Sequence, residues 1–215
     1  MTAILKVDTI QDTSGNNIIN ENSNTITIGA SGDTTNIIGT LQNNGSALNF
    51  ATVNGITEAD QWRLTSNLSA SGTNLTSNLE RNDTSFAYIG SGMTESSGVF
   101  TFPSTGIYLI DYNVSANATS AGDIRYSGGK IQATTNDSAY SDMGETYNGC
   151  NNHGSPYYFS SNVKIFFDVT NTSTHKVKFY VGSSATVNFQ GSTSEQRTSM
   201  TFIRLGDTWW QIENI

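Results

Sequence analysis

The stretch from Gly98 to Ala118 constrains the fold of this chain most, because it is densely apolar and has a two-residue period. Apolar and polar residues alternate from Ile110 to Ala116. This is typical of a strand with one buried and one wetter face. The run is interrupted at Pro103–Gly106, where proline and glycine suit a tight turn. The pattern predicts two strands and a turn, which we expect to form the central hairpin of the main domain.

The composition favours β structure throughout. Only 13% of the 215 residues are charged, compared with roughly 25% in a typical globular domain. Asn, Ser, Thr and Gly supply the remaining polarity, and these residues favour turns and strand surfaces over helix interiors. We therefore expect an all-β chain.

Several further elements follow from local pattern. The first strand is expected at Gln61–Leu68, and Ser127-Gly128-Gly129 is expected to be a hairpin turn. Residues 135–156 are polar and glycine-rich and predict a long loop. A core strand is predicted at Val163–Val169, and further strands are predicted at Lys176–Val181, Thr186–Phe189 and Met200–Leu205. Short strands with such turns between them are typical of a β-sandwich or jelly roll.

Residues 1–57 have a different character from residues 58–215, which we expect to form a separate head domain. Ile18, Ile28, Ile38 and Leu48 recur at ten-residue intervals, with turn residues between them. One chain cannot bury enough of these side chains to offset the entropy of ordering, whereas three chains wound together can. The pattern predicts an intertwined trimeric β stalk with these four residues in its core. The alternative is a disordered, Asn-rich linker.

Charge and cysteine content exclude some classes of protein. A net charge of −8 disfavours binding to nucleic acid and to anionic membrane surfaces. The single cysteine, Cys150, excludes an intrachain disulfide. The sequence shows no secretory leader and no apolar run near the roughly 20 residues of a membrane span. We expect synthesis in a cytoplasm and no membrane insertion.

Catalytic signals are weak. Cys150 and His153 offer two metal ligands, where a zinc site needs three or four, and no nucleophile or phosphate-loop motif is present. Asp137, Asp142 and Glu145 could pair for glycoside hydrolysis or bind calcium, but solvated loop charge is the simpler interpretation. We expect no enzymatic activity, no metal and no cofactor.

The best binding candidate is the polar segment between Tyr140 and Phe159. Tyrosines combine an apolar face with a polar tip, which suits sugars and protein partners. The predicted receptor-binding residues are Tyr140, Tyr147, His153, Tyr157 and Tyr158. Some of these tyrosines could instead cover the edge of the sandwich. The loop Gln190–Arg197 is a second candidate.

The central block resembles a known family. Gly98, Phe100, Pro103, Gly106 and Tyr108 match the G-x-F-x-x-P-x-x-G-x-Y pattern that links the second and third strands in the complement 1q and tumour-necrosis-factor superfamily. Residues 202–205 resemble its closing strands, so the resemblance covers about residues 61–205. It implies that the head is a TNF-like jelly roll.

The N-terminal sequence Leu5-Lys6-Val7-Asp8-Thr9-Ile10-Gln11 resembles the opening of tail-fibre and related virion proteins of marine and cyanobacterial phages. That resemblance implies a homotrimer that contacts other virion proteins through its N-terminus and exposes its head. The front sheet of the jelly roll would then pack near a threefold axis. Tyr108, Tyr112 and Phe202 are candidates for that contact, and the alternative for each of them is a place in the core of the sandwich.

These expectations combine into one functional hypothesis. The chain is expected to be a phage fibre or spike protein on the tail or capsid surface of a virion, made in the host cytoplasm. Its head would bind a glycan or protein receptor on the host surface. One alternative is a purely structural decoration or baseplate protein without a receptor role. Another is a hydrolase of surface polysaccharide on the same scaffold.

Overall fold

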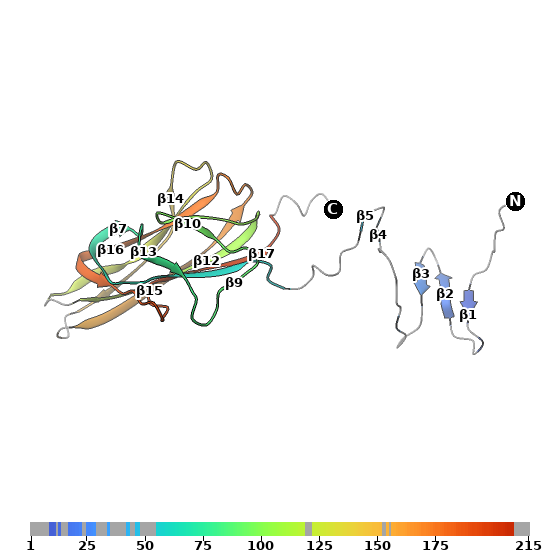
Figure 1. The fold of residues 1–215 in the computed structure, drawn as a ribbon, viewed down its shortest axis with the longest axis horizontal. Coiled ribbons are helices and arrows are strands. Elements are labelled where there is room, and N and C mark those ends of the chain that lie inside the picture. The colour runs from blue at the N-terminus through green and yellow to red at the C-terminus, as the bar shows by residue number, and fades with distance from the viewer. Residues whose placement is uncertain are drawn as a thin grey trace. The chain divides into compact units, whose positions relative to one another are not determined.

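The chain divides into two compact units, Met1–Asn54 and Gly55–Ile215, which are considered separately. In the second unit, the computed structural model describes residues 55–118, 122–151, 154 and 156–208 (Figure 1). In the first unit it describes residues 9–11, 13, 17–22, 25–28, 34, 42–43 and 46–47. Every regular element among all these residues is a β-strand. The described residues accordingly include no helix that could cross a membrane.

The first unit contains two small antiparallel sheets. One joins β1 (Thr9–Gln11), β2 (Asn17–Asn22) and β3 (Thr25–Ile28), and the other joins β4 (Gln42–Asn43) and β5 (Ser46–Ala47).

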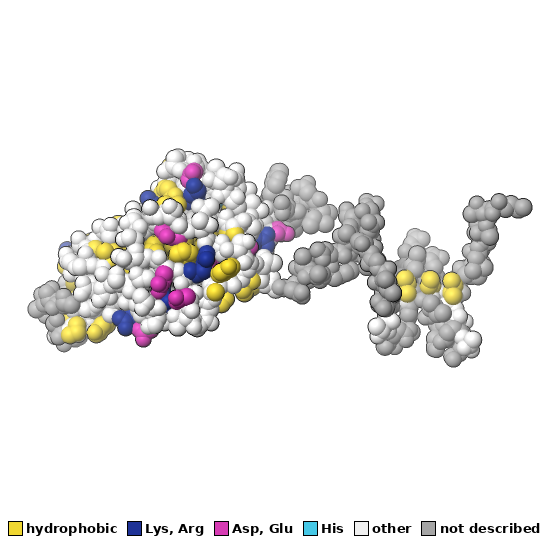
Figure 2. Space-filling model, in the orientation of Figure 1, with side chains coloured by type: hydrophobic (Ala, Val, Ile, Leu, Met, Phe, Trp, Pro, Cys, Tyr) yellow, Lys and Arg dark blue, Asp and Glu magenta, His cyan; other side chains and the backbone are white. Residues whose placement is uncertain are grey.

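The register of the three-stranded sheet aligns three isoleucines. Ile10 pairs with Ile19, and Ile19 pairs with Ile28. Their exposed fractions are 40%, 38% and 55%, and the row is visible in Figure 2. The observed spacing is nine residues, and Ile28 alone belongs to the set predicted for the stalk core. Ile18 lies in β2 outside this row, whereas Ile38 and Leu48 lie outside the described residues.

The second unit, the head, is a sandwich of two sheets, here called the front sheet and the back sheet. The front sheet comprises β15 (Tyr157–Val169), β12 (Gly106–Ala118), β17 (Ser199–Gly206), β6 (Ala59–Leu64), β8 (Leu79–Arg81) and β9 (Tyr88–Ile89). The back sheet comprises β14 (Ser141–Cys150), β13 (Ile124–Thr134), β16 (Lys176–Phe189), β7 (Leu68–Asn74), β11 (Val99–Thr101) and β10 (Thr94–Ser96).

The strand β16 joins the two sheets. Over most of its length it pairs with β13 on one edge and with β11 and β7 on the other. Its last residues then pair with the end of β12, where Phe189 lies opposite Ala116. The two layers therefore belong to one continuous hydrogen-bonded network (Figure 1).

Aromatic side chains from both sheets fill the core. The ring centroid of Phe100 on β11 lies 5.5 Å from that of Phe179 and 5.3 Å from that of Phe202. The residues Tyr108, Tyr112 and Phe202 are 1%, 0% and 1% exposed. These three side chains therefore belong to the interior of the sandwich and do not contribute to a contact around an external axis.

The structure confirms the strands and the turn of the Gly98–Ala118 stretch, but the hairpin prediction is wrong. β11 pairs with β10 and β16 in the back sheet, whereas β12 pairs with β15 and β17 in the front sheet. The turn at Pro103–Gly106 thus carries the chain from one layer to the other. Gly106 has φ = +145°, and a Cβ there would lie 2.5 Å from Arg204 Nε, so only glycine fits.

Three other local predictions are also wrong. The predicted first strand Gln61–Leu68 spans parts of β6 and β7, which lie in different sheets. The expected turn at 127–129 is the interior of the continuous strand β13. The expected loop 135–156 contains β14, an edge strand that pairs with β13. Its mostly exposed side chains explain why it lacks an apolar signal.

Candidate functional site

A pocket of about 170 Å³ lies over strands of the back sheet. Its aromatic lining comes from Tyr126 on β13, Tyr147 on β14 and Tyr180 on β16. The polar lining comes from Ser71, Lys130, Gln132 and Ser183, and Gly182 completes it. The consecutive strands β13 and β14, together with β7 and β16 from other parts of the chain, therefore build one site, which we call the tyrosine pocket.

Paired glycines shape the tyrosine pocket. Gly182 on β16 lies opposite Gly72 on β7 and opposite Gly128 on β13. A Cβ at Gly72 would lie 2.3 Å from the hydroxyl oxygen of Tyr180, and one at Gly182 would lie 2.8 Å from its ring carbon Cε1. The Tyr180 side chain thus occupies space that is open only because both positions lack a side chain.

Tyr126 and Tyr147 form a second aromatic group at the pocket. Their ring centroids are 5.5 Å apart and their planes are inclined by 79°, which is a favourable edge-to-face arrangement. Tyr126 is 45% exposed and Tyr147 is 38% exposed, so part of each ring is available to a ligand. Partial burial raises the pKa of Tyr147 above its ordinary value, so its hydroxyl stays protonated at neutral pH and can donate or accept a hydrogen bond.

The charged residue in the pocket lining, Lys130, forms salt bridges. Lys130 Nζ lies 2.5 Å from Asp142 Oδ2 and 3.6 Å from Glu145 Oε2. Gln132 Nε2 donates to Asp142 Oδ1 at 2.7 Å. The hydrogen bond to Asp142 raises the pKa of Lys130, and the bonds from Lys130 and Gln132 lower the pKa of Asp142. Both groups therefore stay charged over a wide pH range and neutralise each other.

One hydrogen-bonding atom beside this pair is unused. The carbonyl oxygen Oε1 of Gln132 is buried and has no hydrogen-bond partner among the described residues. A buried carbonyl oxygen without a partner costs free energy. Gln132 belongs to the lining of the pocket, but this oxygen itself is buried, and the amide acts there by donating to Asp142.

The structure disperses the residues predicted for receptor binding. Tyr147 lines the pocket. The ring centroid of Tyr140 lies 4.3 Å from the ammonium of Lys178. Tyr157 is 6% exposed and its hydroxyl donates to the carbonyl of Gly122, whereas Tyr158 is 62% exposed on the front sheet. His153 lies outside the described residues. A shared receptor site for these five residues stays a prediction.

Sequence reasoning missed Tyr126, Tyr180, Lys130 and Gln132. Placing a turn at residues 127–129 concealed that Tyr126, Lys130 and Gln132 share one strand. For Tyr180 a signal exists: Lys176, Lys178 and Tyr180 alternate with buried positions along β16. This alternation places Tyr180 on the outer face of the sheet and so indicates a surface site. The sequence does not predict which strands lie beside β16, so it does not predict the other residues of the pocket.

The three carboxylates considered for hydrolysis or calcium binding have lysine partners instead. Asp137 lies 2.6 Å from Lys176 Nζ, and Asp142 and Glu145 share Lys130. Within the described part of the chain, no three His, Cys, Asp or Glu residues are grouped so that they could hold a metal ion.

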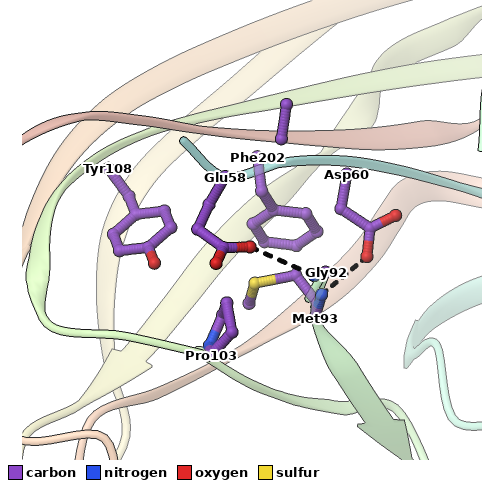
Figure 3. Close-up of a pocket in the computed structure, with 8 residues that line it drawn as sticks. Glu58, Asp60, Gly92, Met93, Pro103, Tyr108 and Phe202 are labelled. Carbon is purple, nitrogen blue, oxygen red and sulfur yellow. Dashed lines mark hydrogen bonds between the residues drawn. The ribbon is translucent and has the colours of Figure 1, made fainter. Parts of the chain in front are cut away.

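A second, smaller hollow near the front sheet has a structural role (Figure 3). Its Glu58 carboxylate accepts hydrogen bonds from the backbone N–H of Ser91 and of Gly92, at 2.8 and 3.2 Å. Asp60 accepts one from the N–H of Met93 at 2.6 Å. These bonds hold the segment before β10 against β6, and the hollow has no room for a water molecule. It is therefore not a ligand site.

Comparisons with known proteins identify the fold. No protein-family model and no curated protein matches the chain by sequence. Its structure resembles Eiger TNF from S. frugiperda, with a TM-score of 0.53 and 9% identity over 72% of this chain and 96% of that one. Murine APRIL at pH 5.0 gives a TM-score of 0.50 and 13% identity over 69% and 98%. The head therefore has a TNF-like jelly-roll fold, as the central motif predicts.

Proposed function

We propose that this chain is the protein of a trimeric virion fibre or spike, whose head binds a receptor on the host surface through the tyrosine pocket. The observation that best supports receptor binding is the pocket itself, in which two partly exposed tyrosine rings lie beside a salt-bridged lysine. A binding site of this kind needs no catalytic group. The receptor is a surface glycan or protein.

The outward face of the front sheet supports a trimer. Leu109 on β12 lies opposite Phe166 on β15 and opposite Ile203 on β17, so their side chains share one face. Phe166 is 70% exposed, and Leu205, two positions beyond Ile203, is 54% exposed. A contiguous apolar cluster on a surface marks an interaction site. We assign this front-sheet cluster to contact between copies of the chain.

The first unit supports the same assembly. Ile10, Ile19 and Ile28 form one apolar row with exposed fractions of 40%, 38% and 55%. A small sheet with one exposed apolar row gains stability when other chains cover that row. The exposed isoleucine row therefore favours a trimeric stalk over a disordered linker for the first unit. In this proposal the stalk and the head are separate parts of the fibre.

The decisive experiment is adsorption to host cells. Purified full-length protein should bind the cells and compete with the virus, reducing infection in proportion to its concentration. The Tyr147→Ala variant should compete less, because it lacks one wall of the pocket. Protein that decorates particles but neither binds cells nor competes would support the purely structural alternative. Release of reducing sugar from host polysaccharide would support the hydrolase alternative.

A further inference from the structure

The tyrosine pocket presents aromatic faces that suit a sugar ring. Tyr126 and Tyr147 leave 45% and 38% of their surfaces open. One face of a hexose carries mainly C–H groups, which pack on an aromatic ring and are removed from water there. Each phenol hydroxyl can at the same time donate to or accept from a sugar hydroxyl. The side chains of Tyr126 and Tyr147 therefore complement both the apolar C–H face and the hydroxyl groups of a pyranose.

The polar lining complements sugar hydroxyls, which both donate and accept hydrogen bonds. Lys130 retains donor capacity beyond its bond to Asp142, because an ammonium has three N–H groups. Ser71, an exposed residue of the lining, contributes a hydroxyl that can donate and accept. Donors and hydroxyl acceptors thus occur together at one pocket.

The charges at the pocket disfavour an ionic ligand of either sign. An anionic sugar would have to compete with Asp142 and Glu145, which lie 2.5 and 3.6 Å from the Lys130 ammonium. A cationic ligand could be attracted to the tyrosine faces, but it would have to compete with Lys130 for the Asp142 and Glu145 carboxylates, which are already paired. An uncharged ligand avoids both costs.

The size of the pocket limits how much of a ligand it can hold. Its volume is about 170 Å³, below the roughly 300–1,000 Å³ of pockets that enclose a drug-sized molecule. One ring can enter, and the remainder of a longer glycan would extend over the surface. From these four observations we propose that the tyrosine pocket binds a single uncharged hexose unit of a surface glycan. This inference rests on the proposed receptor-binding function and specifies its ligand.

Saturation-transfer difference NMR on the full chain tests the inference. The probes are the methyl glycosides of glucose, mannose and galactose, with N-acetylneuraminic acid as the anionic probe and glucosamine as the cationic one. At least one neutral glycoside should receive saturation and bind more tightly than both charged probes. Tyr147→Ala and Tyr126→Ala should each weaken that binding by about tenfold, which corresponds to about 1.4 kcal/mol. Tyr88→Ala, an equally drastic change at a tyrosine that is 46% exposed on the other sheet, should leave it unchanged.

A charge-altering variant tests the selectivity separately. Asp142→Asn combined with Glu145→Gln should release the Lys130 ammonium, so N-acetylneuraminic acid should bind at least tenfold more tightly than it binds the original protein. Both replaced side chains are partly exposed, at 43% and 60%, so the fold should persist. Unchanged binding of the anionic probe would contradict the role assigned to the salt bridge.

The outcomes for the sugar and for the receptor function are distinguishable. If the protein adsorbs to host cells but binds no neutral glycoside, the saccharide inference is wrong and the receptor function stands. Tighter binding of either charged probe than of every neutral one would also overturn the inference. If a neutral glycoside binds at the pocket but the protein does not adsorb to cells, the inference stands and the proposed receptor function fails.

Discussion

At the scale of single residues, buried Arg63 connects three segments of the head. Its side chain is 0% exposed. Its Nε donates to Glu80 at 2.8 Å, and its terminal nitrogens donate to Asp83 at 2.6 Å and to the carbonyl of Thr193. Arginine suits this site because its planar guanidinium has five donors in a fixed arrangement. The residue thereby ties β6 to the segment after β8 and to the 190–197 loop.

Replacement of Arg63 should therefore be costly. Arg63→Ala leaves the Thr193 carbonyl without this donor and two carboxylates without their cation, and should lower the free energy of unfolding by about 3 kcal/mol. Urea denaturation measures the loss. The matched control is Arg197→Ala, whose partner Glu195 is 62% exposed, and which should change stability by less than about 1 kcal/mol. Equal losses in the two variants would show that burial of the Arg63 network does not matter.

At the scale of elements, alternation predicts which residues face the core but not which strands pair. The two-residue period correctly located β12, whose buried and half-buried positions alternate from Ile107 to Ala116. On one edge β11 pairs with residues 94–96 through the local two-residue turn Ser97-Gly98, which the prediction overlooked in favour of the turn at Pro103–Gly106. On its other edge it pairs with residues 176–177, which are distant in sequence. The residues next to a strand in sequence do not indicate which distant strand will pair with it. For the same reason the tyrosine pocket, built from four strands, could be predicted only at Tyr147.

The glycine pair that suggested a turn has a packing role in β13. A Cβ on Gly129 would lie 2.5 Å from ring carbon Cε1 of Tyr112 and 2.9 Å from Val114 Cγ2. Gly129→Ala should therefore destabilise the head by about 2 kcal/mol through overpacking. Gly206→Ala is the matched control, because a Cβ at that strand position meets nothing within 4 Å.

Thermal unfolding of the two glycine variants separates packing from backbone effects. The Gly206 variant should unfold at the original temperature or slightly above it, since alanine restricts the unfolded chain. The Gly129 variant should unfold at a clearly lower temperature. If both variants melt together, the close approach of Tyr112 to β13 is not a constraint on this position.

At the scale of the whole molecule, the general fold was readable from the sequence, whereas the side chains that face outward from the front sheet were not. Low charge, abundant Asn, Ser, Thr and Gly, and the motif from Gly98 to Tyr108 together predicted the jelly roll. The sequence left open which aromatic side chains face the axis and which face the core, because an aromatic side chain in an alternating strand can face either way. Tyr108, Tyr112 and Phe202 face the core, and the exposed apolar surface is instead provided by Phe166 and its neighbours.

The proposed trimer predicts the effect of a charge in the front-sheet cluster. Phe166→Asp should raise the concentration at which the assembly dissociates by at least about tenfold, because each interface would then bury a carboxylate. Light scattering on dilution measures this as a fall from three times the 23.1 kDa chain mass. Tyr126→Ala, on the opposite sheet, should dissociate as the original protein does. A monomeric original protein at all concentrations would contradict both the cluster assignment and the stalk.

The shared strand β16 also sets the order in which the head can become complete during synthesis. Its residues 176–189 supply hydrogen-bond partners for β7, β11, β12 and β13, which all precede it in the chain. Until those residues have left the ribosome, four earlier strands lack a neighbour, and ladders between strands distant in sequence form slowly. Most of the head must therefore be translated before its core can close. The unpaired edges in that interval are the surfaces at which neighbouring nascent chains of an oligomer can pair incorrectly.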